Sequence, residues 1–245
     1  MHRSEQSTMR GLYDIHCHIL PGVDDGARNM EEACWMLKRE YEEGVRSIIV
    51  TPHFRYEMFE PPLALVKEQF EKVKRAAADI GEDLKLYLGC ELHTSMDMAS
   101  ALKKGERLTM AGSRYVLVEF GNFDDKAYIR ERVQQLMLRG YMPIIAHVER
   151  YRATKGDIDF IAELKKLGAH MQVNTDSITG KEGFTIKRFC KKMMKENLVD
   201  FIGTDGHGST RRIPEIAKCC QQVEKTMGTQ YAKRIFIENP KKITG

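Results

Sequence analysis

The chain has 245 residues, of which 42% are hydrophobic and 30% are charged, and its formal net charge is +4. This length fits one large α/β domain, and the mild positive charge suits an anionic substrate but does not indicate a nucleic-acid partner. The sequence contains no run of about 18 apolar residues, so we expect no membrane span. Residues 1–10 lack the apolar centre of a secretory signal, and we interpret them as a flexible lead before a single domain over residues 11–245.

The cysteines argue against two kinds of site. They form no C-x-x-C pair and no zinc-knuckle spacing. A cysteine-based phosphatase needs an arginine about six residues after its thiolate, and none of these cysteines has one. Without an export signal, reduced thiols in a cytoplasmic protein are the simplest interpretation. The cysteines are Cys17, Cys34, Cys90, Cys190, Cys219 and Cys220.

Strand-like apolar runs alternate with helical patterns along the whole chain. The predicted strands cover residues 11–15, 45–50, 84–90, 115–118, 141–146, 169–173 and 198–202. The predicted helices cover residues 29–43, 63–80, 96–104, 127–139, 158–167, 181–196, 213–227 and 230–237. The first helix has a capping box, in which Asn29 caps the backbone and Glu32 can reach back to it. Such alternation predicts a parallel sheet, which could be an open doubly wound sheet or a closed barrel.

Polar side chains decide between these two architectures, because they follow every predicted strand at its carboxyl end. In chain order they are His16 and His18, His53, Glu91, Glu119, His147, then Gln172, Asn174 and Ser177, and finally Asp205 and His207. In a barrel these ends meet at one face, whereas an open sheet would spread them apart. The pattern therefore favours a distorted, TIM-like, seven-stranded (β/α) barrel.

The first of these strands ends in a motif typical of metal sites. Because residues two apart share a strand face, Asp14, His16 and His18 should point one way and Ile15 and Cys17 the other. An isolated histidine or glutamate at a strand end is more often an ion-pair or hydrogen-bond partner than a ligand. Six of the eight histidines, however, lie at predicted strand ends.

The number and type of these side chains predict more than one bound ion. Mixed imidazole and carboxylate ligands suit Mn, Fe or Zn better than Ca. Asp24 and Asp25, in a turn after the first strand, could add oxygen ligands. Because the candidates exceed what one ion needs, we expect two or three ions per chain.

Several ordered motifs give the chain a resemblance to a known superfamily. The runs DIHCHILPGVDDGA, TPHF, GCELH, VEF, IIAHVERY, QVN and GTDGH resemble the polymerase-and-histidinol-phosphatase (PHP) superfamily. Within it, the chain is similar to the bacterial manganese-dependent protein-tyrosine phosphatases that act on capsule and exopolysaccharide kinases. The likeness extends from Tyr13 to the closing ENPKKI. It implies the PHP fold, a distorted seven-stranded barrel, with a trinuclear Mn²⁺ site.

The resemblance also implies a role for individual residues. It matches His16, His18 and Asp205 to ligands of the first ion, with Glu91 as a bridging carboxylate. It matches Glu119 and His147 to ligands of the second ion. The third ion is matched to His53, His207 and one aspartate of the Asp24–Asp25 pair, of which Asp25 is favoured. It matches Arg150 and Arg212 to basic residues that hold the substrate phosphate. Val148, Gly206 and Gly208 depart from the family pattern without removing a ligand.

The chemistry of these residues fits phosphate hydrolysis. Clustered divalent ions lower the pKa of a shared water, so that hydroxide can attack phosphorus at neutral pH. Arginine binds phosphate through its planar fork, although Arg150 could instead form a surface ion pair with Glu149, and Arg212 could be a solvated residue at a helix start. Phe54, Tyr56 and Phe59 could contact a phenyl ring or simply anchor their loop.

The expected function is hydrolysis of phosphotyrosine on a protein. The expected partner is an autophosphorylated bacterial tyrosine kinase that controls capsule or exopolysaccharide synthesis. Two alternatives remain, a small-molecule phosphatase acting for example on histidinol phosphate and a non-catalytic PHP binding module. The atypical loop FRYEMFEPP leaves the substrate preference open, and the sequence does not determine the native metal or the oligomeric state.

Overall fold

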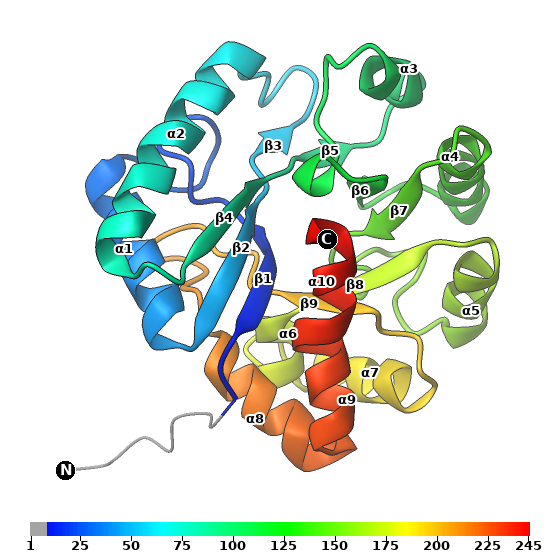
Figure 1. The fold of residues 1–245 in the computed structure, drawn as a ribbon. Coiled ribbons are helices and arrows are strands. Elements are labelled where there is room, and N and C mark those ends of the chain that lie inside the picture. Colours follow the sequence, from blue (N-terminus) through cyan, green and yellow to red (C-terminus); the bar gives the residue numbers. More distant parts are fainter. Residues whose placement is uncertain (1–8) are drawn as a thin grey trace.

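The structure, a computed structural model, describes residues 9–245 (Figure 1). Residues 1–8, most of the predicted lead, lie outside the described residues. The strands are β1 (Leu12–Cys17), β2 (Val45–Val50), β3 (His53–Phe54), β4 (Lys85–Leu88), β5 (Glu91–His93), β6 (Tyr115–Glu119), β7 (Met142–Ile145), β8 (His170–Asn174) and β9 (Phe201–Gly203). The principal helices are α1 (Met30–Glu42), α2 (Leu63–Ile80), α3 (Met98–Lys103), α4 (Lys126–Leu138), α5 (Ile158–Lys166), α6 (Thr175–Thr179), α7 (Phe184–Lys195), α8 (Ile216–Met227), α9 (Thr229–Lys233) and α10 (Asn239–Thr244). Two shorter helical turns are η1 (Met110–Gly112) and η2 (Arg234–Glu238).

The strands run parallel and follow one another around a closed curve. They form a sheet in the order β1-β2-β4 and a second in the order β3-β5-β6-β7-β8-β9. The two sheets continue each other, because the N–H of Gly89 donates to Val50 O (2.8 Å) and the N–H of Glu91 donates to Pro52 O (3.0 Å). The ring is closed between β9 and β1 by the bonds His18 N to Gly206 O and Asp205 N to His16 O, both 2.8 Å.

The prediction of a distorted barrel is therefore confirmed, and its distortion has a local origin. The second and third predicted strands correspond to β2 and β4, and each is followed by a short strand that was not predicted. β3 follows β2 after Thr51 and Pro52, and β5 follows β4 after Gly89 and Cys90. At the opposite end of the barrel, η1 contacts both β4 and β6, which do not pair with each other.

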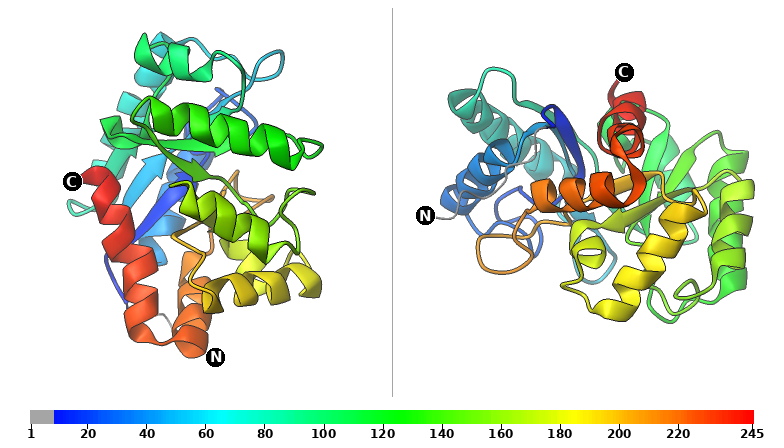
Figure 2. Two further views of the ribbon diagram at one scale, coloured as in Figure 1. Left: turned by 90° about the vertical axis from the view of Figure 1, so that its right-hand side faces the viewer. Right: turned by 90° about the horizontal axis from the view of Figure 1, so that it is seen from below.

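Apolar side chains fill two layers, one on each side of the strands. Figure 2 shows the larger helices on the outside of the curved sheet, where their apolar faces pack to form the main core. A smaller inner core includes Ile15, Ile49, Leu117 and Ile144, and Ile243 from α10 joins it. None of the described helices combines the length and the apolar character that a bilayer crossing requires.

Sequence periodicity did not predict the helix at the C-terminal end of the chain. α10 contacts β1 and η1, and Figure 1 shows it within the curve of the sheet. This helix has six residues, with Pro240 in its first turn, and is too short to show a helical apolar period. α6 was missed for the same reason, since it has only five residues.

Candidate metal centre

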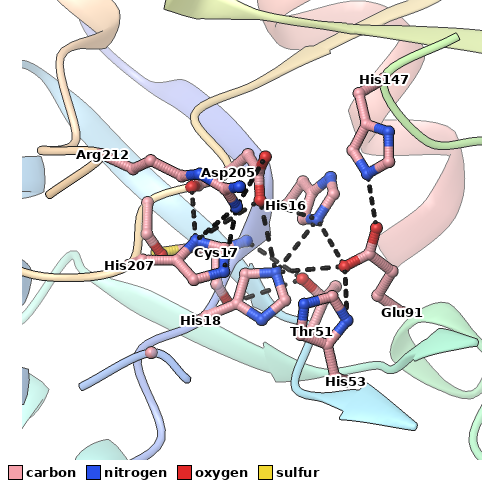
Figure 3. Close-up of polar contacts among 12 residues, drawn as sticks. His16, Cys17, His18, Thr51, His53, Glu91, His147, Asp205, His207 and Arg212 are labelled. Atoms are coloured by element: carbon pink, nitrogen blue, oxygen red, sulfur yellow. Dashed lines mark hydrogen bonds and ion pairs between the residues drawn. The ribbon is translucent and has the colours of Figure 1, made fainter. Parts of the chain in front are cut away.

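The carboxyl ends of the strands and the loops after them bring all nine predicted metal ligands into one cluster. Figure 3 shows the part of the cluster around Glu91. Glu91, at the start of β5, lies at its centre. Its Oε2 is 3.2 Å from His16 Nε2, 3.2 Å from His18 Nε2 and 3.0 Å from His53 Nδ1. Its Oε1 is 2.9 Å from His147 Nε2. One carboxylate thus touches four imidazoles that come from three separate strands or strand ends.

The ligand atoms divide into three overlapping groups, in each of which the candidate atoms lie within 4.8 Å of one another. The groups are His16, His18, Glu91 and Asp205; His18, His53 and His207; and His53, Glu91 and Glu119. The first contains the four residues that the resemblance matched to the first ion. The other two groups do not match the ligand sets that the resemblance implies for the second and third ions, because His18 and His53 each belong to two groups.

The local geometry fits metal ions better than a network of hydrogen bonds. The Nε2 atoms of His16 and His18 face each other at 3.2 Å, and both lie 3.5 Å from Asp205 Oδ1. Glu91 Oε2 is fully buried and has no hydrogen bond of good geometry within the described part of the chain, although three imidazole nitrogens lie close to it. Lone pairs that converge on a shared point in this way are the arrangement that a divalent ion needs.

The charges of the cluster also call for cations. Burial opposes ionisation of Glu91, but the neighbouring His16 and His53 outweigh it and hold the pKa of its carboxyl well below the usual range. Burial likewise opposes protonation of His18, but hydrogen bonds to Asp205, Asp24 and Glu91 raise the pKa of its imidazole well above its usual value. Buried carboxylates therefore dominate the site, and either protons or metal ions must balance them.

Two residues orient the histidines of the first strand from behind. Asp24 Oδ2 accepts a hydrogen bond from His18 Nδ1 at 2.9 Å, and Gln172 Oε1 lies 3.2 Å from His16 Nδ1. The same Gln172 oxygen accepts the N–H of His147 at 2.7 Å. Such partners fix which imidazole nitrogen is available to a metal.

The carboxylate ligands have equivalent support. Asn174 donates from Nδ2 to Asp205 Oδ2 at 2.8 Å, and His93 Nδ1 lies 3.1 Å from Glu119 Oε2. Gln172, Asn174 and His93 were not among the predicted ligands, whereas Asp24 was the alternative to Asp25. The sequence feature that marked Gln172 and Asn174 as site residues was their position at the end of the sixth predicted strand. His93 was marked in the same way, as one of the six histidines at predicted strand ends.

The geometry separates the two adjacent aspartates that the sequence left open. Asp24 is buried, and besides His18 it accepts the N–H groups of His53 and Gly26, both at 2.9 Å. The side chain of Asp25 is 36% exposed, and its Oδ1 lies 3.4 Å from His207 Nε2 and 3.6 Å from His53 Nε2. The hydrogen bond to His207 lowers the pKa of the Asp25 carboxyl. Asp25 is thus placed among imidazoles as a ligand would be, while Asp24 supports the loop.

The prediction that Asp14 shares a face with His16 and His18 is wrong. The pairing register of β1 with β2 shifts between Asp14 and Cys17, so the strict alternation of faces is lost there. Asp14 is fully buried behind the cluster, near Cys17 and Glu40.

Both predicted arginines reach the same ligand. Arg150 Nη1 lies 2.8 Å from Asp205 Oδ2, and its Nη2 lies 3.2 Å from Glu182 Oε1. Arg212 Nη1 lies 3.4 Å from the same Asp205 oxygen (Figure 3). The alternative partner of Arg150, Glu149, is fully buried and accepts the N–H of Asn174 instead.

The aromatic side chains after β3 mainly anchor their loop. The ring of Phe54 is buried beneath the guanidinium of Arg107, 3.2 Å from the ring centre. Phe59 stacks on His53 with ring centres 5.3 Å apart and an interplanar angle of 9°. Tyr56 is exposed and donates its hydroxyl proton to Asp97 at 2.8 Å. Of the three, only Tyr56 is left with an exposed ring.

The two thiols beside the cluster are poor nucleophiles. Cys17 and Cys90 are buried beside the cluster. Burial raises the pKa of Cys90 to about 12 and that of Cys17 well above its usual value. Neither can be a thiolate at neutral pH, as a cysteine-dependent phosphatase requires.

Comparison with known proteins identifies the family. The family model for CpsB/CapC proteins of capsular polysaccharide synthesis matches residues 12–245. This chain belongs to the CpsB/CapC family. The tyrosine-protein phosphatase CpsB of Streptococcus pneumoniae is 33% identical to it over 237 residues, which cover 95% of this chain and 98% of that relative. The tyrosine-protein phosphatase YwqE of Bacillus subtilis is 30% identical over 221 residues, which cover 89% of this chain and 86% of YwqE.

The solved structures agree with the sequence relatives. Crystal structures of YwqE and CpsB, described as unique metal-dependent tyrosine phosphatases, include a chain that matches with a TM-score of 0.88 and 28% identity. The match covers 95% of this chain and 94% of that one. The resemblance indicated by the sequence is therefore confirmed, and the enzyme class is that of a metal-dependent tyrosine-protein phosphatase without a cysteine nucleophile.

Proposed function

We propose that the protein removes phosphate from tyrosine on an autophosphorylated bacterial tyrosine kinase that controls capsule or exopolysaccharide synthesis, and that it uses two or three Mn²⁺ ions. The observation that carries the proposal is the cluster around Glu91, with nine imidazole and carboxylate side chains at one barrel face in a CpsB/CapC chain. The same donor set would also accept Fe or Zn.

The proposed ligand assignment is the one that the family resemblance implies. His16, His18 and Asp205 hold the first ion, Glu91 bridges, Glu119 and His147 hold the second, and His53, His207 and Asp25 hold the third. Distances support the second and third sets: Glu119 Oε1 lies 3.9 Å from His147 Nε2, and Asp25 Oδ1 lies 3.6 Å from His53 Nε2 and 3.4 Å from His207 Nε2.

The residues of the chain divide the remaining work. When bound, the ions would supply an activated water at neutral pH and positive charge against the phosphoryl oxygens. Arg150 and Arg212 bind and orient the phosphate, because each guanidinium has five N–H donors and only part of them are used by Asp205 and the groups beside it. The leaving group is a phenolate with a pKa of about 10, which departs more readily than the alkoxide of serine. Aryl phosphates should therefore be cleaved much faster than alkyl phosphates.

Exposed apolar side chains favour a protein substrate over a small molecule. Of the seven large hydrophobic side chains that are exposed in the described part of the chain, four lie in the loops that directly follow β3, β5 and β6, and a fifth is the first residue of α7, which follows β8 and α6. We call these the apolar rim: Tyr56, Met58, Met96, Phe123 and Phe184. Phe123 follows Glu119 by four residues, and Phe184 follows Glu182, the partner of Arg150, by two. A phosphorylated polypeptide would cover such a rim, whereas histidinol phosphate would leave it in water.

The test is a phosphatase assay with added Mn²⁺ on three substrates: a tyrosine phosphopeptide, the matching serine phosphopeptide and histidinol phosphate. We expect the tyrosine phosphopeptide to have the highest kcat/KM. The double variant Phe123→Ser/Phe184→Ser should raise KM for the phosphopeptide and leave hydrolysis of p-nitrophenyl phosphate unchanged. Leu138→Ser, at an exposed leucine on α4 outside the rim, is the matched control.

Two results would replace the proposal with one of its alternatives. A higher kcat/KM for histidinol phosphate would assign a small-molecule phosphatase. An absence of hydrolysis with every substrate, in protein shown to hold its metals, would assign a non-catalytic binding module.

A further inference from the structure

A buried acid lies behind the metal centre and belongs to none of the ligand groups around Glu91. Glu40 is on α1, and none of its surface is exposed. Its Oε2 has no hydrogen-bond partner among residues 9–245, and its Oε1 lies 3.5 Å from the hydroxyl of Thr204. One of its carboxyl oxygens is within 4.8 Å of Asp14, which is also fully buried. An acid in such a place is costly unless it is neutral or paired.

Asp14 ties together the two strands that carry the first metal ligands. Its Oδ1 accepts the N–H of His16 at 3.2 Å and the N–H of Thr204 at 3.0 Å. Its Oδ2 accepts the hydroxyl proton of Thr204. The Asp14 carboxylate therefore fixes the backbone at two places. One is His16, a proposed ligand on β1, and the other is Thr204, the residue before the proposed ligand Asp205.

The two strands are pressed together at this point. A Cβ on Gly203 would lie 2.7 Å from the Cβ of His16, so only glycine permits the approach. Asp205 then donates its N–H to His16 O at 2.8 Å and adopts a left-handed backbone with φ of 53°. A non-glycine residue in that conformation is strained and depends on its surroundings to stay there.

The hydroxyl of Thr204 determines the role of Glu40. Its oxygen lies closest to Asp14 Oδ2 and accepts the N–H of Gly206 at 3.1 Å. With the hydroxyl proton directed to Asp14, a lone pair of Thr204 faces Glu40, and a protonated Glu40 is the matching hydrogen-bond donor. Burial, followed by the charge of Asp14, raises the pKa of the Glu40 carboxyl well above its usual value, which agrees with a neutral acid at this position.

We propose that Glu40, Thr204 and Asp14 form a brace that holds His16 and Asp205 in metal-binding geometry, with Glu40 as a neutral hydrogen-bond donor at its outer end. Glu40 and Thr204 are positioning residues, since neither touches a metal-ligand atom of the cluster. The inference rests on the proposal that His16 and Asp205 bind metal.

The test measures Mn²⁺ affinity of metal-stripped protein by calorimetry, with the bound ion followed by its electron paramagnetic resonance signal. Glu40→Leu removes the donor and should weaken Mn²⁺ binding about 10- to 100-fold, the range found when a group behind a ligand is lost. Glu40→Gln keeps an N–H donor and should bind Mn²⁺ like the parent. Thr204→Val should behave like Glu40→Leu, and Thr204→Ser, which keeps the hydroxyl, should restore binding.

Two control variants accompany these measurements. Leu37→Ala removes buried apolar contacts on the same helix and should lower the melting temperature without changing Mn²⁺ affinity, which separates the brace from a general loss of stability. His16→Ala tests the underlying proposal, because unchanged Mn²⁺ binding in that variant would mean that the metal assignment itself is wrong.

The brace is overturned if Glu40→Leu binds Mn²⁺ as tightly as the parent while His16→Ala does not. It is also overturned if Glu40→Gln is as weak as Glu40→Leu, since the donor would then not be what matters. Should Glu40→Leu fail to fold, the threonine pair decides, and parental affinity in Thr204→Val refutes the brace.

Discussion

Replacing Arg150 with alanine removes a guanidinium that is mostly buried and lies directly above the metal centre. Its side chain is 21% exposed and pairs with Asp205 at 2.8 Å and with Glu182 at 3.2 Å. Loss of one preorganised donor to a developing negative charge typically costs about 100- to 1,000-fold in rate, or about 2.7–4 kcal/mol. We expect Arg150→Ala to lower kcat/KM on a tyrosine phosphopeptide by an amount in this range.

The metals and the fold should survive this change. Asp205 Oδ2 keeps its hydrogen bond from Asn174 at 2.8 Å and its contact with Arg212 at 3.4 Å, so the ligand remains oriented. Glu182 is 37% exposed, so water can replace its lost partner. The variant should therefore lose catalysis rather than metal.

The assay combines steady-state kinetics in Mn²⁺ with metal content measured by mass spectrometry. Arg152→Ala, at an exposed arginine two residues along the chain, is the matched control and should keep parental kinetics. Arg150→Lys should fall between parent and alanine variant, because it retains the charge but not the planar fork. Near-parental turnover in Arg150→Ala would refute the assigned role. Loss of metal together with activity would instead make Arg150 part of the support for Asp205.

Three further predictions concern the metals, the aspartate pair and the thiols. A chelator should abolish activity and Mn²⁺ should restore it, with about two or three ions bound per chain, and full activity in metal-free protein would refute this. Asp25→Ala should lower metal content with little change in melting temperature. Asp24→Ala should instead cost roughly 3 kcal/mol of folding stability, because a buried carboxylate with three partners is lost, and the reverse pattern would exchange their roles. Cys90→Ser should leave kcat unchanged because its thiol is protonated, and a trapped phosphocysteine would contradict this.

The ligand types could be predicted from sequence because of where they fall relative to the strands. His53, Glu91 and His147 each follow an apolar run, and a polar residue at such a place is visible without any coordinates. Barrel strands deliver their carboxyl ends to one face, so spacing along the chain was enough to expect a common site. The structure brings these residues together around Glu91.

The prediction failed where alternation along a strand was taken as strict. The register shift in β1 turns Asp14 away from the cluster, and no local pattern signals a bulge in this strand. Asp24 and Asp25 are adjacent residues of one type, so their roles depend on which loop atoms surround them. Asp24 meets the N–H groups of His53 and Gly26, which lie at very different distances along the chain.

The amino-acid sequence by itself determined the alternation of strands and helices, the chemistry of the candidate ligands and the family to which the chain belongs. These properties depend on short-range periodicity and on residue type. Tertiary structure alone decided that Glu40 meets Thr204, because this contact exists only once β9 has closed against β1. It also decided that Arg150 meets Asp205, because this contact requires β7, β8 and β9 to lie side by side. Closure of the barrel joins the two ends of the chain, and the free energy that selects it is distributed over the whole core rather than encoded in any one segment.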